Sequence, residues 1–226
     1  MTGGLPVKQR LTQEAAHVWA RLSGQTRRAQ RSAKREFSSV LSRLTSDDVA
    51  VDLGANAGEF TGPMADTGAH VHAFEPDPHA YEILRKSHGH RPNVTLIKAA
   101  AGLADGTARL YRSSVFEKQP DRRSKSSSLF AEKHNVDDRN AVTVEVLDFL
   151  AFIDRLNRPI ALIKMDIEGG EVPLMEALLR SPQAARIGHV FVETHERGLP
   201  HLARRTATLK AATASLTSPR VNWDWH

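Results

Sequence analysis

The chain has 226 residues, of which 31 are Lys or Arg, 26 are Asp or Glu and none is Cys, so its net charge is +5. This length suits one α/β domain with a substantial core. Without cysteine, disulfides and thiolate metal sites are excluded. No apolar run approaches the roughly 18 residues of a membrane span, and no signal-like segment follows the first basic residues, so we expect a cytoplasmic protein.

Residues 1–44 predict a helical, basic arm. Between Arg21 and Arg35 the segment carries further Lys and Arg side chains and no acid. Such a segment could bind nucleic acid or anionic lipid, although a solvated helix is the simpler interpretation. An apolar stripe that includes Trp19, Phe37 and Val40 indicates that the arm leans on the main domain, residues 45–226.

From residue 45 onward, strand-like and helix-like segments alternate. This alternation predicts a mostly parallel central sheet with helices on both faces, with strands near 49–53, 70–74, 93–97, 160–165 and 188–194. Asp105-Gly106 is typical of a hairpin turn, so we expect 98–101 and 107–112 to pair as antiparallel strands. The closing segment 221–226 could supply a sixth strand.

A glycine-bounded turn follows the first strand. Gly54 and Gly58 have no side chain, so the chain can turn sharply and a ligand can lie against main-chain N–H groups. The spacing matches neither the dinucleotide fingerprint nor a P-loop, which favours a phosphate-free ligand and disfavours a nicotinamide-linked dehydrogenase. Glu75 ends the second strand, where an acid can bind both hydroxyls of a ribose.

Acidic residues follow the apolar run 160–165. In parallel sheets ligands gather at the carboxyl ends of the strands, so we expect Asp166 to lie beside Gly54 and Asn56. Clustered acids raise one another's pKa and lose solvation, which indicates a functional use for Asp166 and Glu168.

Two neighbouring features need separate interpretations. Glu171 falls in the first turn of the next helix, where an acid simply complements the helix dipole. Glu193 and His195 follow the next strand and should reach the same crevice as Asp166. His195 is equally well interpreted as an exposed loop histidine.

These motifs together resemble a known family. Five segments occur in the order and spacing of the FkbM-type S-adenosylmethionine-dependent methyltransferases: Val51–Gly58, Phe74–Pro76, Leu147–Asp148, Ile163–Glu171 and Val192–His195. The resemblance implies the class I methyltransferase fold, which is Rossmann-like with a seven-stranded sheet. It also implies the cofactor S-adenosylmethionine, held by Asp52, Gly54, Ala55, Asn56, Gly58, Glu75, Pro76, Ala99 and Asp166.

The same resemblance implies O-methylation, often of a sugar hydroxyl in a glycan, lipopolysaccharide or secondary metabolite. Our hypothesis for catalysis takes His195 as the base, oriented by Glu193, because a neutral imidazole accepts a proton near pH 7. Asp166 and Glu193 are the other candidate bases. We expect no resident metal, although the acids could instead bind Mg²⁺ and ionise the acceptor that way.

Several alternatives stay open. The segment 113–128 contains almost nothing to bury and is interpreted as a mobile lid, in which Arg122, Arg123 and Lys125 could bind an anionic acceptor or stay solvated. An RNA methyltransferase using the basic arm is less favoured, because few aromatic residues accompany the arm. A non-catalytic S-adenosylmethionine-binding domain is a third possibility. A homodimer could complete a sheet edge that lacks its seventh strand.

Overall fold

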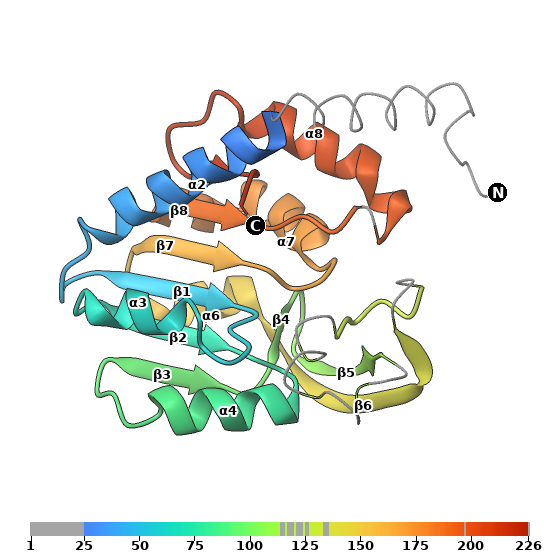
Figure 1. The fold of residues 1–226 in the computed structure, drawn as a ribbon. Coiled ribbons are helices and arrows are strands. Elements are labelled where there is room, and N and C mark those ends of the chain that lie inside the picture. The colour runs from blue at the N-terminus through green and yellow to red at the C-terminus, as the bar shows by residue number, and fades with distance from the viewer. Residues whose placement is uncertain are drawn as a thin grey trace.

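The structure is a computed structural model in which residues 25–113, 116, 120, 124, 127–132, 136–196 and 198–225 are described. Their centre is a six-stranded sheet of order β3-β2-β1-β7-β8-β9, shown in Figure 1, in which every neighbouring pair is parallel. The strands are β1 (Val49–Leu53), β2 (His70–Phe74), β3 (Val94–Ile97), β7 (Ile160–Met165), β8 (Ile187–Val192) and β9 (Arg220–Asn222). The predicted parallel sheet and sixth strand are confirmed. Within the described residues this sheet has no seventh strand, contrary to the family pattern.

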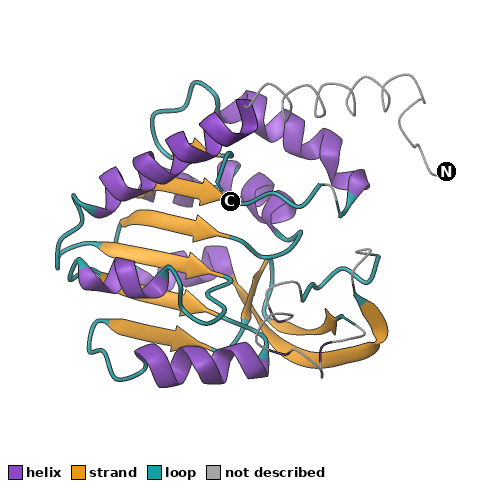
Figure 2. Cartoon of the chain, viewed as in Figure 1, coloured by secondary structure: helices purple, strands orange, loops and turns teal. Residues whose placement is uncertain are grey.

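Helices cover both faces of this sheet (Figure 2). They are α2 (Gln25–Leu41), α3 (Thr61–Asp66) and α4 (Pro78–His88) on one face, and α6 (Phe149–Leu156), α7 (Glu171–Leu179) and α8 (Ala203–Thr213) on the other. Successive strand residues point to opposite faces, so Ala50 shares an apolar cluster with α2 and α3, whereas Val51 shares one with α6 and α7. Every residue of β1 is buried for this reason.

Helix α2 is the part of the basic arm that the structure describes. Ala33, Phe37 and Val40 are buried on one side of it, at helical spacing. The Phe37 ring lies 4.4 Å from the Trp225 ring and 5.1 Å from the Phe191 ring, measured between centroids. The expected packing of the arm is therefore confirmed for α2, while the domain boundary at residue 45 stays a prediction.

A second, three-stranded sheet contains β4 (Ala100–Gly102), β5 (Gly106–Arg112) and β6 (Asp137–Asp148) in the order β4-β6-β5. Strand β6 is antiparallel to β5 and parallel to β4. The expected hairpin between 98–101 and 107–112 is wrong, because β6 lies between the two strands. Asp105 instead bridges to the end of β6, where its carboxylate accepts a hydrogen bond from the Asp148 N–H at 2.8 Å.

The register of the main sheet places the carboxyl ends of β1, β2, β7 and β8 at the same edge. Leu53 lies opposite both Phe74 and Met165, and Met165 lies opposite Val192. Strand order reverses between β1 and β7, so this edge is the topological switch point where ligands of open α/β sheets bind. Figure 1 shows the second sheet beyond the arrowheads of the main sheet. No helix in the described ranges is both long and apolar enough to cross a bilayer.

Candidate active site

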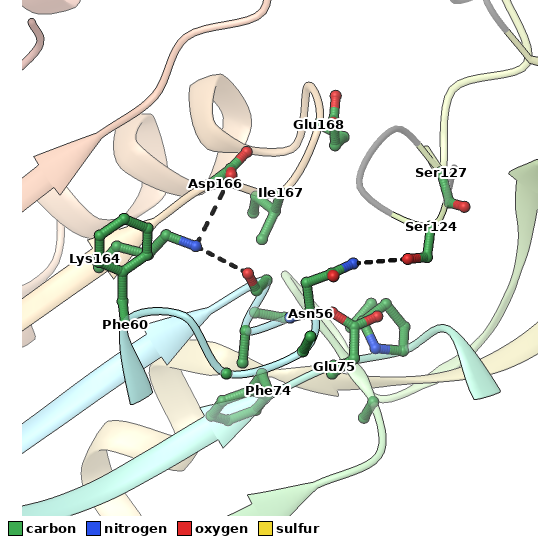
Figure 3. A pocket seen from close by; sticks show the side chains of 18 of the residues that line it. Asn56, Phe60, Phe74, Glu75, Ser124, Ser127, Lys164, Asp166, Ile167 and Glu168 are labelled. Carbon is green, nitrogen blue, oxygen red and sulfur yellow. Dashed lines mark hydrogen bonds and ion pairs between the residues drawn. The ribbon is translucent and has the colours of Figure 1, made fainter. Parts of the chain in front are cut away.

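A cavity of about 330 Å³ opens at the switch point, within the size range of small-molecule sites. All of the predicted cofactor residues except Asp52 line it: Gly54, Ala55, Asn56, Gly58, Glu75, Pro76, Ala99 and Asp166. Asp166 therefore lies beside the glycine turn, as the sequence predicted. Figure 3 shows the side chains of Asn56, Glu75 and Asp166, which follow β1, β2 and β7, around this cavity.

The glycine turn has little room for side chains. Gly54 has a φ of +76°, and a Cβ there would collide with the carbonyl oxygen of Asp166. The backbone N–H groups of Gly54 and Ala55 both donate to the Phe74 carbonyl, at 3.1 and 2.9 Å. Because no side chain projects from Gly54, a flat ligand can approach the backbone of this turn closely.

Glu75 is held rigidly where the ribose of the cofactor is expected. Its two carboxylate oxygens accept hydrogen bonds from the N–H groups of Asn56 and Asp77, each at 2.7 Å. Burial raises the pKa of Glu75 to about 8, even though these N–H groups act in the opposite direction. Near neutral pH the ligand-free protein therefore holds this carboxyl mostly protonated.

A buried ion pair supports the Glu75 end of the cavity. The Arg112 guanidinium forks onto the Asp77 carboxylate at 2.8 and 2.9 Å, and the two side chains are only 10% and 1% exposed. Asp77 also caps α4 by accepting from the His79 N–H at 2.8 Å. The Asp77 carboxylate thus contacts both α4 and β5, and the backbone N–H of the same residue donates to Glu75.

Two described residues of the segment 113–128 line the cavity. Ser124 and Ser127 line it, and the Asn56 side-chain amide donates to the Ser124 hydroxyl at 3.1 Å (Figure 3). The Ser127 hydroxyl donates to Asp77 at 3.4 Å. These described residues border the cavity, and a mobile lid stays a prediction. Arg122, Arg123 and Lys125 lie outside the described residues.

Lys164 is a site residue that our interpretation of the sequence missed. Its buried ammonium donates to the Gly54 carbonyl at 2.8 Å and lies 3.3 Å from Asp52. The same ammonium lies 3.8 Å from Asp166 (Figure 3). Burial alone lowers the pKa of Lys164, but Asp52 and Asp166 raise it overall, so the group stays charged. The sequence signal for this site residue was a lysine inside the otherwise apolar run 160–165.

Asp52 does not line the cavity. It is fully buried behind the glycine turn, where it accepts a hydrogen bond from the Thr61 hydroxyl at 2.8 Å and faces Lys164. Its contribution to the site is therefore to hold Lys164 rather than to lie against the ligand.

His195 lies among three carboxylates. Its Nδ1 is 2.9 Å from Glu171, and its Nε2 is 3.1 Å from Glu168 and 3.6 Å from Asp166. Glu171 is fixed in turn, because it accepts from the N–H groups of Ile167 and Gly169 at 2.8 and 2.9 Å. The residue on Nδ1 is thus Glu171, to which we had assigned only a helix-dipole role, and not Glu193.

The acids change the charge state expected of His195. Burial alone lowers the pKa of His195, but Glu171, Glu168 and Asp166 raise it to about 9. This raised pKa favours an imidazolium at neutral pH in place of the neutral imidazole that we expected.

Asp166 is affected by the same surroundings. Burial raises its pKa to about 7, with Lys164 acting against the increase and the Glu193 charge adding to it. Asp166 and Glu168 line the cavity, whereas His195 and Glu193 are not among its described lining residues. Of the three predicted catalytic residues, Asp166 is therefore the one among the described lining residues of the cavity.

Comparisons with known proteins identify the family of this chain. The sequence model of the Methyltransferase FkbM domain matches residues 52–211. Hexuronic acid methyltransferase AglP of Haloferax volcanii is 26% identical over 158 residues, which are 69% of this chain and 59% of the relative. Ribosomal RNA small subunit methyltransferase A of Thermotoga petrophila is 45% identical over 53 residues, which are 24% of this chain and 20% of that protein. The chain thus spans less than two thirds of the length of either relative.

A solved structure described as a putative rRNA-methylase from Clostridium thermocellum has a TM-score of 0.42 at 10% identity, over 79% of this chain and 78% of that one. The family match is the stronger finding, because it covers most of the chain and begins at the end of β1. The glycine turn, the acid after β2 and the acids after β7 all fall within it. The chain belongs to the FkbM family of S-adenosylmethionine-dependent methyltransferases.

Proposed function

We propose that this protein is an O-methyltransferase that transfers the methyl group of S-adenosylmethionine to a sugar hydroxyl. The observation that carries the proposal is that one cavity is lined both by Glu75, which follows β2, and by Asp166, which follows β7. The sugar as acceptor is supported by the name of the relative AglP, a hexuronic acid methyltransferase. The acceptor belongs to a glycan, a lipopolysaccharide or a secondary metabolite.

The cofactor supplies an electrophilic methyl group on a sulfonium, so the protein mainly has to orient the acceptor and exclude water. Glu75 binds the ribose, and the glycine turn lies against the rest of the ligand. Asp166 accepts the proton of the acceptor hydroxyl as the O–C bond forms and the C–S bond breaks. A positioned base of this kind contributes about 10²- to 10⁴-fold to the rate.

We assign the base to Asp166 and not to His195 on geometric grounds. Both ring nitrogens of His195 face carboxylates, and His195 is not among the described residues that line the cavity. His195 is instead a positioning residue that holds Asp166 and Glu168. Glu193 acts on Asp166 through its charge.

The test is methyl transfer from radiolabelled S-adenosylmethionine to a panel of neutral hexosides, uronosides, amino sugars and short RNA. We expect transfer to a sugar, and a loss of about 100-fold or more in kcat for Asp166→Asn with a much smaller change in cofactor Kd. Glu145→Gln, which removes an exposed carboxylate on β6, is the matched control.

Two results would contradict the proposal in different ways. Calorimetry that detects no binding of S-adenosylmethionine removes the cofactor site. Binding without transfer to any acceptor makes the protein a non-catalytic binding domain, and transfer to RNA that falls steeply with salt makes it an RNA methyltransferase.

A further inference from the structure

Asp166, Glu168 and His195 form a cluster with the composition of a metal site. One ligand atom from each residue lies within 4.8 Å of the other two. The residues come from two places in the chain, since Asp166 and Glu168 follow β7 and His195 follows β8. We infer that this cluster binds a divalent first-row transition-metal ion at the acceptor end of the cavity.

An unsatisfied atom points into the cluster. The Oδ1 atom of Asp166 is buried, yet it accepts no hydrogen bond from the described residues. Its nearest ion-pair atom is the Nε2 of His195, 3.6 Å away. Buried carboxylate oxygens are normally hydrogen-bonded or bound to a cation, so this oxygen is available as a ligand.

The surroundings of His195 match those of metal-binding histidines. Such histidines donate one ring N–H to a carboxylate and bind the metal through the other nitrogen. Glu171 lies 2.9 Å from Nδ1 and is itself fixed by two backbone N–H groups. This arrangement makes Nε2 the ligand atom, and Nε2 is the nitrogen that faces Glu168 and Asp166.

The ligand types select the class of ion. Mg²⁺ and Ca²⁺ prefer all-oxygen sites, whereas an imidazole beside two carboxylates suits divalent transition metals such as Mn²⁺ or Fe²⁺. The inference therefore departs from our expectation of no metal and from the Mg²⁺ alternative. Neither the family description nor the names of the relatives assign an ion to these residues.

Three protein ligands leave coordination positions open for a substrate. Asp166 and Glu168 line the cavity, so the open positions face the acceptor. Neighbouring oxygens of a sugar would fill them, and the bound hydroxyl would ionise more readily. This role rests on the proposed function, and proton transfer then uses the Oδ2 atom of Asp166. Ion binding itself does not depend on the acceptor.

The experiment is titration of chelator-treated, full-length protein with MnCl2, followed by the EPR signal of free Mn²⁺ and by calorimetry. We expect one ion per chain, bound more tightly than Mg²⁺ by the same protein. Glu168→Gln keeps the side-chain shape and should weaken Mn²⁺ binding about 10-fold or more, and Glu171→Gln about 10- to 100-fold. Glu145→Gln should bind like the unmodified protein, and thermal melts of each variant identify any that fail to fold.

The inference is overturned if no stoichiometric Mn²⁺ uptake occurs, if Glu168→Gln binds as well as the control, or if Mg²⁺ binds more tightly than Mn²⁺. Methyl transfer that persists in a chelator, without Mn²⁺ uptake, overturns the metal site and leaves the proposed function intact. Mn²⁺ uptake by a protein that binds no S-adenosylmethionine overturns the proposed function and leaves the metal site intact.

Discussion

Binding of S-adenosylmethionine should release a proton near neutral pH, and Glu75 should be its source. The carboxyl is buried with a pKa of about 8, so one pH unit below that value about nine tenths of the ligand-free protein is protonated. A carboxylate that accepts hydrogen bonds from both ribose hydroxyls has to be ionised. Ionising Glu75 at pH 7 costs about 1.4 kcal/mol, which weakens cofactor binding about tenfold relative to pH 9.

Calorimetry in two buffers of different ionisation enthalpy measures the released protons directly. We expect about 0.9 proton per site at pH 7 and about 0.1 at pH 9, as follows from a pKa of about 8. The amino group of the ligand titrates in the same range, so Glu75→Gln supplies the baseline to subtract. This variant should also bind about 10- to 150-fold more weakly at pH 9, because hydrogen bonds to a charged group contribute about 1.5 to 3 kcal/mol.

The stability of the ligand-free protein supplies an independent measurement. The folded pKa of Glu75 lies above its ordinary value of 4.5, so its contribution to stability is present at low pH and is lost as pH rises toward 8. Urea unfolding at pH 6 and pH 8 should therefore show a larger loss for the unmodified protein than for Glu75→Gln. Equal proton release by the two proteins, together with equal pH profiles of unfolding, would refute the reasoning.

Three further substitutions probe other parts of the site. Gly54→Ala should abolish cofactor binding and lower the free energy of unfolding by about 2 kcal/mol or more in urea titrations, because a Cβ at this positive φ collides with the Asp166 carbonyl. The control is Gly106→Ala, which has open space around it and should change the free energy of unfolding by less than about 0.5 kcal/mol. Arg112→Leu leaves the buried Asp77 carboxylate unpaired and should cost about 3 to 5 kcal/mol by the same method, a loss below 1 kcal/mol being incompatible with the buried pair. His195→Ala should lower kcat about 10- to 100-fold with nearly unchanged cofactor Kd, whereas a matching loss of cofactor affinity in binding assays would contradict a positioning role.

The edge of the main sheet could be predicted from sequence because two simple rules determine it. Apolar runs of strand length interrupted by helices imply a parallel sheet, and the carboxyl ends of parallel strands meet at one edge. Gly54, Glu75 and Asp166 each follow such a run directly, so their meeting at the cavity required no knowledge of side-chain positions.

Contacts across long stretches of chain could not be predicted in this way. The Asp105-Gly106 turn is a local signal for a hairpin, but β6 pairs with both β4 and β5 and lies between them. Which carboxylate contacts Nδ1 of His195 could not be predicted either, because several acids follow β7 and the backbone there determines which of them points inward. Glu168 adopts a φ of +58° there, a conformation that a regular pattern of residues does not predict.

Lys164 connects the two halves of the cavity. Its ammonium donates to the carbonyl of Gly54, which begins the glycine turn, and it also lies beside Asp166. Gly54 and Asp166 both line the cavity. Asp52 holds the same ammonium from behind, with no exposure to solvent. Because the buried Lys164 ammonium cannot lose a partner without a cost in stability, it fixes both the glycine turn and Asp166 relative to β7. Under the proposed function, one strand would therefore align the cofactor and the acceptor, as an in-line methyl transfer requires.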